Sequence, residues 1–146
     1  EVFVAGLLHD IGKVVLYVKW PDVGQQITAV TRNTSQPLMD VEQELFEVTH
    51  ADVGGWLASA WHLPTSLREP ILHHHTPAAA QDAKLQTAIV HVADVLVKGL
   101  ACGNPGDNLV PPLSRPAWDL VGLDAQSLAH CLAQATEEFQ TIDDYL

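Results

Sequence analysis

The sequence of 146 residues is long enough for one domain with a sizeable core, and its 47% of hydrophobic residues excludes a disordered chain. A formal net charge of −11 argues against direct nucleic-acid binding and against an anionic membrane surface, because basic side chains supply much of the affinity for phosphates. There is no signal-peptide pattern and no bilayer-spanning apolar run. Cys102 and Cys131 lie in apolar segments, which predicts buried, reduced thiols in a cytoplasmic protein.

Residues 1–19 are predicted to form one apolar helix that carries adjacent His9 and Asp10, followed closely by Lys13. An imidazole and a carboxylate inside an apolar run need partners, because burying an unpaired charge is costly. Divalent first-row metals bind both groups. The pair is therefore either part of a metal site or a core histidine that is hydrogen-bonded to its acidic neighbour.

Two shorter helices are predicted next. Trp20-Pro21 ends the first helix, because a residue before proline avoids the helical conformation, and residues 22–33 form a short helix. Asp40 is predicted to cap the helix after that. The glutamates of this helix are most simply its solvated face, and Glu42 is the exception, for which a structural role is the alternative.

A fourth and a fifth helix each carry histidines. Thr49 can cap a helix over residues 50–61, so that His50 lies in its first turn as either a metal ligand or an exposed capping residue. Pro64 is expected at the first position of the next helix, which runs to about His74.

The triple histidine from His73 to His75 closes that helix. Successive helical residues point about 100° apart, so the three rings cannot share one centre unless the helix ends among them. Thr76-Pro77 indicates that it does end there. The alternative is a polar helix end with solvated imidazoles.

The longest apolar helix is predicted over residues 80–101, with His91 and Asp94 three residues apart on one face. A turn is predicted from Gly103 to Gly106, and Asp124 is expected to cap a last helix that ends near residue 143. The predicted fold class is therefore all-α, with one helical domain across residues 1–146.

Four apolar helices that each carry one or two ligand-type residues resemble the HD superfamily of metal-dependent phosphohydrolases. The resemblance narrows to the HDOD branch, the HD-related output domains of bacterial signalling proteins, at Glu42, His50, Gly54, Trp61-His62-Leu63-Pro64 and His74-His75-Thr76-Pro77. It covers residues 1–100 well and the last helix more loosely. It implies a helical bundle of the HD-domain type, here the C-terminal part of a longer protein without the first HD helices.

The resemblance also implies a site for one or two divalent ions of Fe, Mn, Zn or Ni. Its ligands would be His9, Asp10 and Asp94 for the first ion, and His50, His74 and His75 for the second, with Asp10 bridging. Glu42 and His91 would support these ligands through hydrogen bonds. Lys13 would contact a phosphate, and its alternative is a lysine on the helix surface.

Two functions follow from the resemblance. HDOD domains are generally regarded as signalling modules, so the first expectation is a regulatory domain that works with other signalling domains or proteins, such as receiver or cyclic-nucleotide-related modules, and that could hold a metal. The alternative is an active metal-dependent phosphohydrolase or phosphodiesterase acting on a nucleotide or cyclic nucleotide, in which the metal activates water. Two departures from the family's pattern argue against the hydrolase function. The first histidine of the HD signature is absent, and no Gly-Tyr-Pro motif follows His75.

Overall fold

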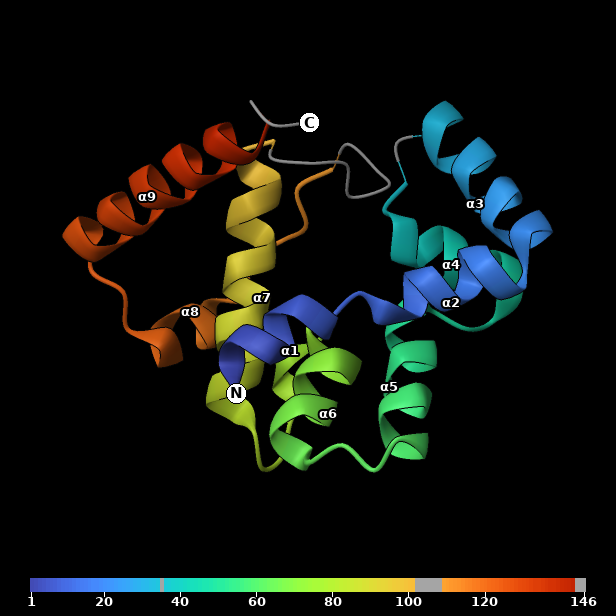
Figure 1. The fold of residues 1–146 in the computed structure, drawn as a ribbon, viewed down its shortest axis with the longest axis horizontal. Helices are drawn as coiled ribbons and strands as arrows, with labels where there is room; N and C mark the ends of the chain where they lie inside the picture. The colour runs from blue at the N-terminus through green and yellow to red at the C-terminus, as the bar shows by residue number, and fades with distance from the viewer. Residues whose placement is uncertain (35, 102–108, 144–146) are drawn as a thin grey trace.

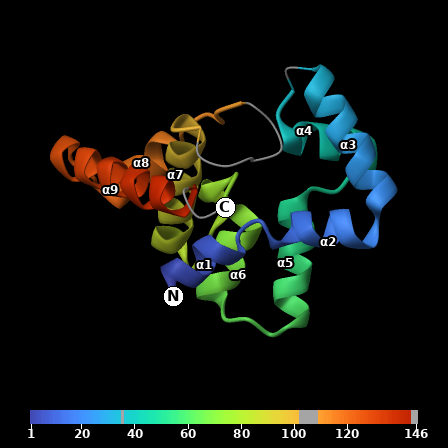
Figure 2. The ribbon, with the colours of Figure 1, turned by 45° about the horizontal axis from the view of Figure 1, so that its top comes forward.

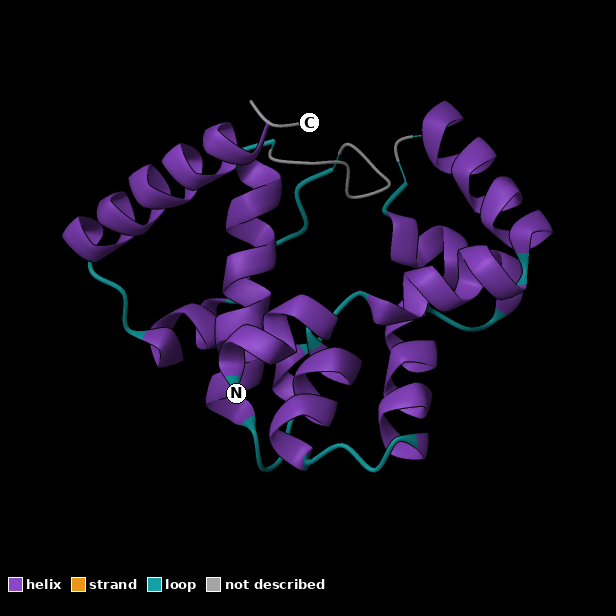
Figure 3. Ribbon diagram, in the orientation of Figure 1, coloured by secondary structure: helices purple, strands orange, loops and turns teal. Residues whose placement is uncertain are grey.

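The computed structural model describes residues 1–34, 36–101 and 109–143, and within these ranges the chain is helical and contains no strand (Figures 1 and 3). The predicted all-α fold class is confirmed. The helices are α1 (Val2–Leu8), α2 (Ile11–Lys19), α3 (Pro21–Asn33), α4 (Leu38–Phe46), α5 (His50–Ala60), α6 (Thr65–His73), the 3₁₀ turn η1 (Pro77–Ala79), α7 (Lys84–Gly99), α8 (Arg115–Val121) and α9 (Ala125–Asp143).

Helices α5 and α6 join two groups of helices. On one side α2 packs on α5, and α3 packs on both α2 and α4; on the other side α1 and α7 pack on α6, with η1 and α8 against α7. Figures 1 and 2 show α3 and α9 at opposite ends of the molecule. Among the helices described, none combines the length and the apolar character that crossing a membrane requires. The arrangement leaves the α1–α2 connection, the start of α5 and the end of α6 near one another.

The prediction of one continuous helix over residues 1–19 is wrong. α1 ends at Leu8 and α2 begins at Ile11, with Asp10 outside helical geometry at φ −98° and ψ 12°. The physical reason lies in the next turn. α2 must approach α5 closely enough for Gly12 to lie against the backbone of His50 and Gly54, whereas α1 packs on α6. The break therefore redirects the chain, and it brings the adjacent side chains of His9 and Asp10 to the same centre.

The helix carrying Glu42 and the one that begins at His50 meet at a well-capped junction. Thr49 caps α5 as predicted, and it forms a full capping box with Asp52. Asp40 does not cap α4. That helix already begins at Leu38, because Leu38 and Val41 are needed against Ile27 of α3 in a small buried cluster.

The later helices differ from the prediction in length. α7 covers Lys84–Gly99 rather than residues 80–101, and α9, with 19 residues, is longer than α7, with 16. Asp124 does cap α9, where its carboxylate accepts from the backbone N–H of Ser127 at 2.7 Å. Cys131 is exposed, contrary to expectation, because it lies on the open side of α9. Cys102 and the turn predicted at 103–106 lie outside the described residues.

A buried glutamate explains where α7 begins. The Glu69 carboxylate on α6 accepts from the backbone N–H groups of Gln81, Asp82 and Ala83, the last at 2.7 Å. These are the donors just before the first turn of α7, which would otherwise lack partners. Burial raises the pKa of Glu69, but these three N–H groups outweigh it and hold the pKa below its ordinary value of 4.5. Glu69 therefore fixes the start of α7 against the end of α6.

Replacing Glu69 by Ala is expected to lower the free energy of unfolding by about 2–3 kcal/mol, because three backbone donors lose a charged acceptor. Urea denaturation of wild type and variant measures this difference. Since the pKa of Glu69 is depressed in the folded state, its contribution is fully present above pH 4.5 and is lost as the pH falls toward the folded pKa. The exposed Glu137→Ala should change stability by less than about 0.5 kcal/mol. An equal effect of both substitutions would contradict this role.

Candidate metal centre

The six residues predicted as ligands come from distant parts of the sequence and meet at one place. They are supplied by the α1–α2 break, the first residue of α5, the two residues that follow α6, and the middle of α7. α6 ends at His73, close to the predicted end at about His74, and the chain turns through His74 and His75. The residues are His9, Asp10, His50, His74, His75 and Asp94.

Asp10 lies at the centre of this group. Its Oδ1 is 3.3 Å from Nε2 of His50 and 3.6 Å from Nε2 of His74. Its Oδ2 is 3.4 Å from Nε2 of His9 and 2.7 Å from Nζ of Lys13. One carboxylate therefore touches three imidazoles and one ammonium group.

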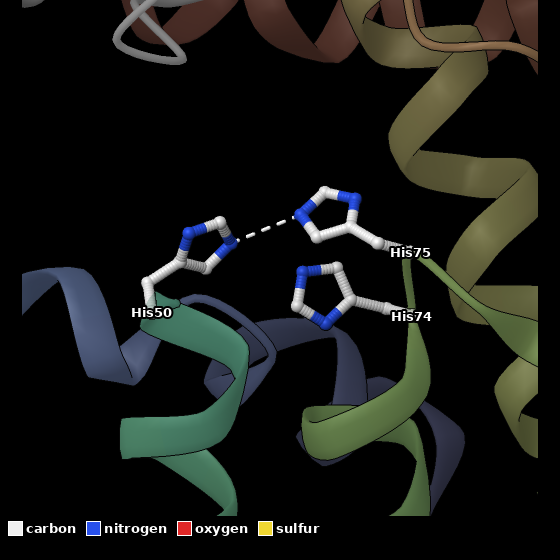
Figure 4. A group of neighbouring side chains, drawn as sticks. All are labelled: His50, His74 and His75. Atoms are coloured by element: carbon white, nitrogen blue, oxygen red, sulfur yellow. Dashed lines mark hydrogen bonds between the residues drawn. The ribbon is translucent and has the colours of Figure 1, made fainter. Parts of the chain in front are cut away.

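The imidazoles form two overlapping groups around Asp10. His50, His74 and His75 offer ligand atoms within 4.8 Å of one another, and the Nε2 atoms of His50 and His75 are 2.9 Å apart (Figure 4). His9, Asp10 and His74 form the second group by the same measure. Asp94 adds a carboxylate, with Oδ1 at 3.7 Å from Nε2 of His9. His74 belongs to both groups, so the groups are adjacent.

Hydrogen bonds on the outer side of two rings decide which nitrogen faces the centre. Nδ1 of His9 lies 2.7 Å from the Gly6 carbonyl oxygen, and Nδ1 of His74 lies 2.9 Å from the Ile71 carbonyl oxygen. Because a carbonyl oxygen only accepts, each Nδ1 carries the proton and donates it. Each Nε2 is then directed toward Asp10. This is the usual arrangement of histidines that bind metal.

Glu42 and His91 are placed to hold the ligands rather than to act as ligands. The Glu42 carboxylate is 1% exposed and accepts both from Nδ1 of His50, at 2.7 Å, and from the His50 backbone N–H, at 2.8 Å. Glu42 thus lies inside the protein and not on a solvated face. Nδ1 of His91 donates to the His74 carbonyl at 2.7 Å, and its Nε2 accepts from the Ser114 N–H at 3.0 Å. Both ring nitrogens of His91 are therefore occupied.

Three buried polar atoms at the centre have no hydrogen-bond partner within the described part of the chain: His9 Nε2, Asp10 Oδ1 and His74 Nε2. Leaving such atoms unsatisfied costs about 1–3 kcal/mol each. All three atoms present lone pairs toward one another. A hydrogen-bond donor or a cation placed between them would therefore satisfy them together. Imidazole nitrogens with carboxylate oxygens are a donor set that fits Zn, Fe, Mn and Ni. The residues present therefore fit a divalent metal ion.

The ionised state of the Asp10 and Asp94 carboxylates favours cation binding. Burial raises the pKa of Asp10, but the close contacts with His50 and His74 and the charge of Lys13 outweigh it, so the pKa lies far below its ordinary value. Burial likewise raises the pKa of Asp94, and contacts with His9 and Lys98 reverse the direction. Both carboxylates are therefore ionised at neutral pH.

The histidines divide into two pairs. Burial lowers the pKa of His74, and burial together with the neighbouring histidines lowers the pKa of His75 to about 2, so both rings are neutral at neutral pH. Burial also lowers the pKa of His9 and His50, but their carboxylate partners prevail and raise both. Neutral imidazoles are the form that binds metals. A cation at the centre would compete with protons on His9 and His50.

A pocket of about 340 Å³ opens beside this centre. Its walls include His50 and His75 together with Lys13 and Lys98. Lys98 is a site residue that the sequence analysis missed, and Nζ of Lys98 lies 3.1 Å from Oδ2 of Asp94. Its four-residue spacing from Asp94 on one helix was the available signal. His73, the extra histidine, lies instead near Glu69, where its charge helps to lower that pKa.

Comparisons with known proteins give one family. Residues 1–77 match the sequence profile of the HDOD domain. A crystal structure of an HDOD domain protein with unknown function from Geobacter sulfurreducens is similar with a TM-score of 0.83 and 25% identity, covering 99% of this chain and 53% of that chain. An uncharacterized protein from Treponema pallidum (strain Nichols) is 27% identical over 110 residues, which is 75% of this chain and 21% of that protein. The chain thus spans about half of one relative and a fifth of the other.

Proposed function

Because the chain belongs to the HDOD domain family, we propose that it is a regulatory domain of bacterial signal transduction that is built around a divalent-metal site. The observation that carries this proposal is the convergence of six ligand-type side chains in which three buried lone-pair atoms have no partner in the described residues. Without a cation, the burial of these unsatisfied polar atoms lowers the stability of the protein. The protein would act in the cytoplasm.

The ion or ions would be held by the two groups around Asp10. His50, His74 and His75 would hold one, and His9, Asp10 and Asp94 would hold the other, with Asp10 shared. A divalent cation supplies Lewis acidity and a fixed link between its ligands. Here the ligands belong to the α1–α2 connection, α5, the end of α6 and α7, so occupancy would tie together the two groups of helices. That link is what makes the site suited to regulation.

The exposed surface of α1 supports a role in contacts with other signalling domains or proteins. Phe3 and Leu7 are 82% and 72% exposed, although large apolar side chains are usually buried. They line an apolar groove of about 390 Å³ that α1 forms with α7 and whose walls also include His9 and Asp94. A change at the metal site would therefore reach this surface directly.

Metal content tests the proposal. We expect mass spectrometry of the purified protein to find about one or two equivalents of Fe, Mn, Zn or Ni, in line with two adjacent ligand groups. His75→Ala should lose part of this metal, and the exposed His130→Ala should keep it. A wild-type protein that stays metal-free after incubation with each ion would end the proposal.

The second candidate function is a metal-dependent phosphohydrolase, and the pocket that reaches His50, His75 and Lys13 favours it. Ligand pockets of this kind can admit a phosphoryl group beside a metal. In such an enzyme Lys13 would bind and orient the phosphate. Metal-loaded protein incubated with bis(p-nitrophenyl) phosphate separates the two functions: a regulatory domain gives no release of nitrophenol above buffer, and a hydrolase gives release that His50→Ala abolishes.

A further inference from the structure

A buried histidine joins the metal centre to the start of α8. His91 on α7 is 3% exposed, and both of its ring nitrogens are used. Its Nδ1 donates to the carbonyl oxygen of His74 at 2.7 Å, and its Nε2 accepts from the backbone N–H of Ser114 at 3.0 Å. His74 is itself fully buried, and its Nε2 faces Asp10. Hydrogen bonds between residues 17 and 23 positions apart in the sequence therefore form one link from the centre outward.

Ser114 is the residue at which α8 begins. It is the N-cap of that helix, and its side chain accepts from the backbone N–H of Ala117. Ala117 is buried, and α8 packs on α7 and on η1, the turn that follows the triple histidine. The first turn of α8 is thus held by its own cap on one side and by His91 on the other.

α9 depends on α8 for its position. Among the helices that the structure describes, α9 is the one that packs closely on no other helix, and most of its residues are exposed. It follows α8 after Gly122, which ends α8 in the left-handed conformation at φ 69°. Figures 1 and 2 show α9 at one end of the molecule, beyond α8. A shift or a loosening of α8 would therefore carry α9 with it.

We propose that His91 is a positioning residue that couples occupancy of the metal centre to α8 and α9, through the backbone N–H of Ser114. The inference rests on the proposed metal site. A cation at Nε2 of His74 would fix that residue from both sides, because Nδ1 already donates to the Ile71 carbonyl oxygen. The His74 carbonyl oxygen would then hold the His91 ring in the orientation that accepts from Ser114. Without the cation, Nε2 of His74 has no partner in the described residues, and the link lacks its inner anchor.

Hydrogen exchange measured by mass spectrometry, with and without Zn²⁺, tests the coupling. We expect Zn²⁺ to slow exchange of the α8 amides at least about fivefold, the low end of typical coupling between two sites. Ser114→Pro removes the N–H that His91 accepts, and the φ of −68° at this position suits proline. In this variant Zn²⁺ should no longer slow exchange in α8. Because coupling is reciprocal, its affinity for Zn²⁺, measured by competition with a chelating dye, should also fall about fivefold.

Ser114→Ala is the matched control, because it loses the same hydroxyl cap and keeps the backbone N–H. It should retain both the slowing of exchange by Zn²⁺ and the Zn²⁺ affinity of wild type. A merely structural role of Ser114 as a cap would affect the two variants alike. Circular dichroism shows whether each variant keeps its helical content.

The outcomes separate this inference from the metal site. If Zn²⁺ binds and exchange in α8 does not change, the coupling is refuted and the metal site stands. If Ser114→Pro equals Ser114→Ala in both measurements, the N–H of Ser114 is not the contact and the inference fails. A Ser114→Pro protein that has lost α8 but binds Zn²⁺ as tightly as wild type also refutes the coupling. If the protein binds none of Zn²⁺, Mn²⁺, Fe²⁺ and Ni²⁺, both this inference and the proposed function fail.

Discussion

Replacing Asp10 by Ala is expected to weaken binding of divalent metal roughly 100-fold or more, since the loss of even an outer hydrogen-bond partner of a ligand costs 10–100-fold. Among the described residues, Asp10 is the one carboxylate that lies within 3.6 Å of all three of His9, His50 and His74. Its removal therefore affects both ligand groups at once. In thermal unfolding, metal at about 100 times its Kd stabilises a protein by about 2.7 kcal/mol, which raises the Tm by about 5–10 °C for a chain of this size. Asp10→Ala should lose that rise.

The matched control is Asp22→Ala, which removes an exposed carboxylate from the first turn of α3. It should retain the metal content of wild type and the metal-dependent rise in Tm. Circular dichroism without metal shows whether Asp10→Ala still folds, because Lys13 loses its partner in that variant. A folded Asp10→Ala protein that retains its full metal content would contradict the geometry of the site.

Replacing Gly12 by Ala is expected to lower the free energy of unfolding by about 3 kcal/mol or more, at the upper end of overpacking effects. A Cβ at Gly12 would overlap the carbonyl oxygen of His50 and come within 2.8 Å of the backbone N of Gly54. These are backbone atoms inside α5, so they cannot move aside as a flexible side chain does. α2 and α5 would have to separate, and His50 would move away from Asp10. Urea denaturation, with metal content measured in parallel, gives both effects.

Gly6→Ala provides the comparison for a glycine in a helix of the same part of the chain. A Cβ at Gly6 meets no atom of the described chain within 4 Å. Alanine has the higher helix propensity, by about 1 kcal/mol in a helix interior. Gly6→Ala should therefore be neutral or slightly stabilising. If both glycine substitutions cost the same stability, close packing of α2 on α5 is not the reason for Gly12.

The residues of the site were largely accessible from the sequence because ligand chemistry is a property of residue type. His and Asp inside apolar runs are rare enough to be noticed, and the end of α6 at His73 followed from Thr76-Pro77. Lys98 was not accessible in the same way, and the inward position of Glu42 was indicated only by the family resemblance. A lysine or a glutamate on a helix is most often solvated, and only the packing of α7 and α4 around the centre buries these two.

The helix boundaries show where local rules fail. The apolar pattern of residues 1–19 is compatible with one helix, and no proline marks a break at Asp10. The break exists because α1 packs on α6 while α2 packs on α5. In the same way, the start of α7 depends on Glu69, which is 12–14 residues away in the sequence. Contacts between distant segments of the sequence therefore decided both helix boundaries, the break at Asp10 and the start of α7.

The sequence by itself determined the helical class, the caps at Thr49 and Asp124 and the types of residue at the centre, because each of these depends on neighbours within a few positions. Only the tertiary structure decided that Asp10 lies between three imidazoles, that their Nε2 atoms face it and that two lysines border the adjoining pocket. Those relations depend on the close approach of α2 to α5 at Gly12, which is a matter of packing in space and not of local sequence.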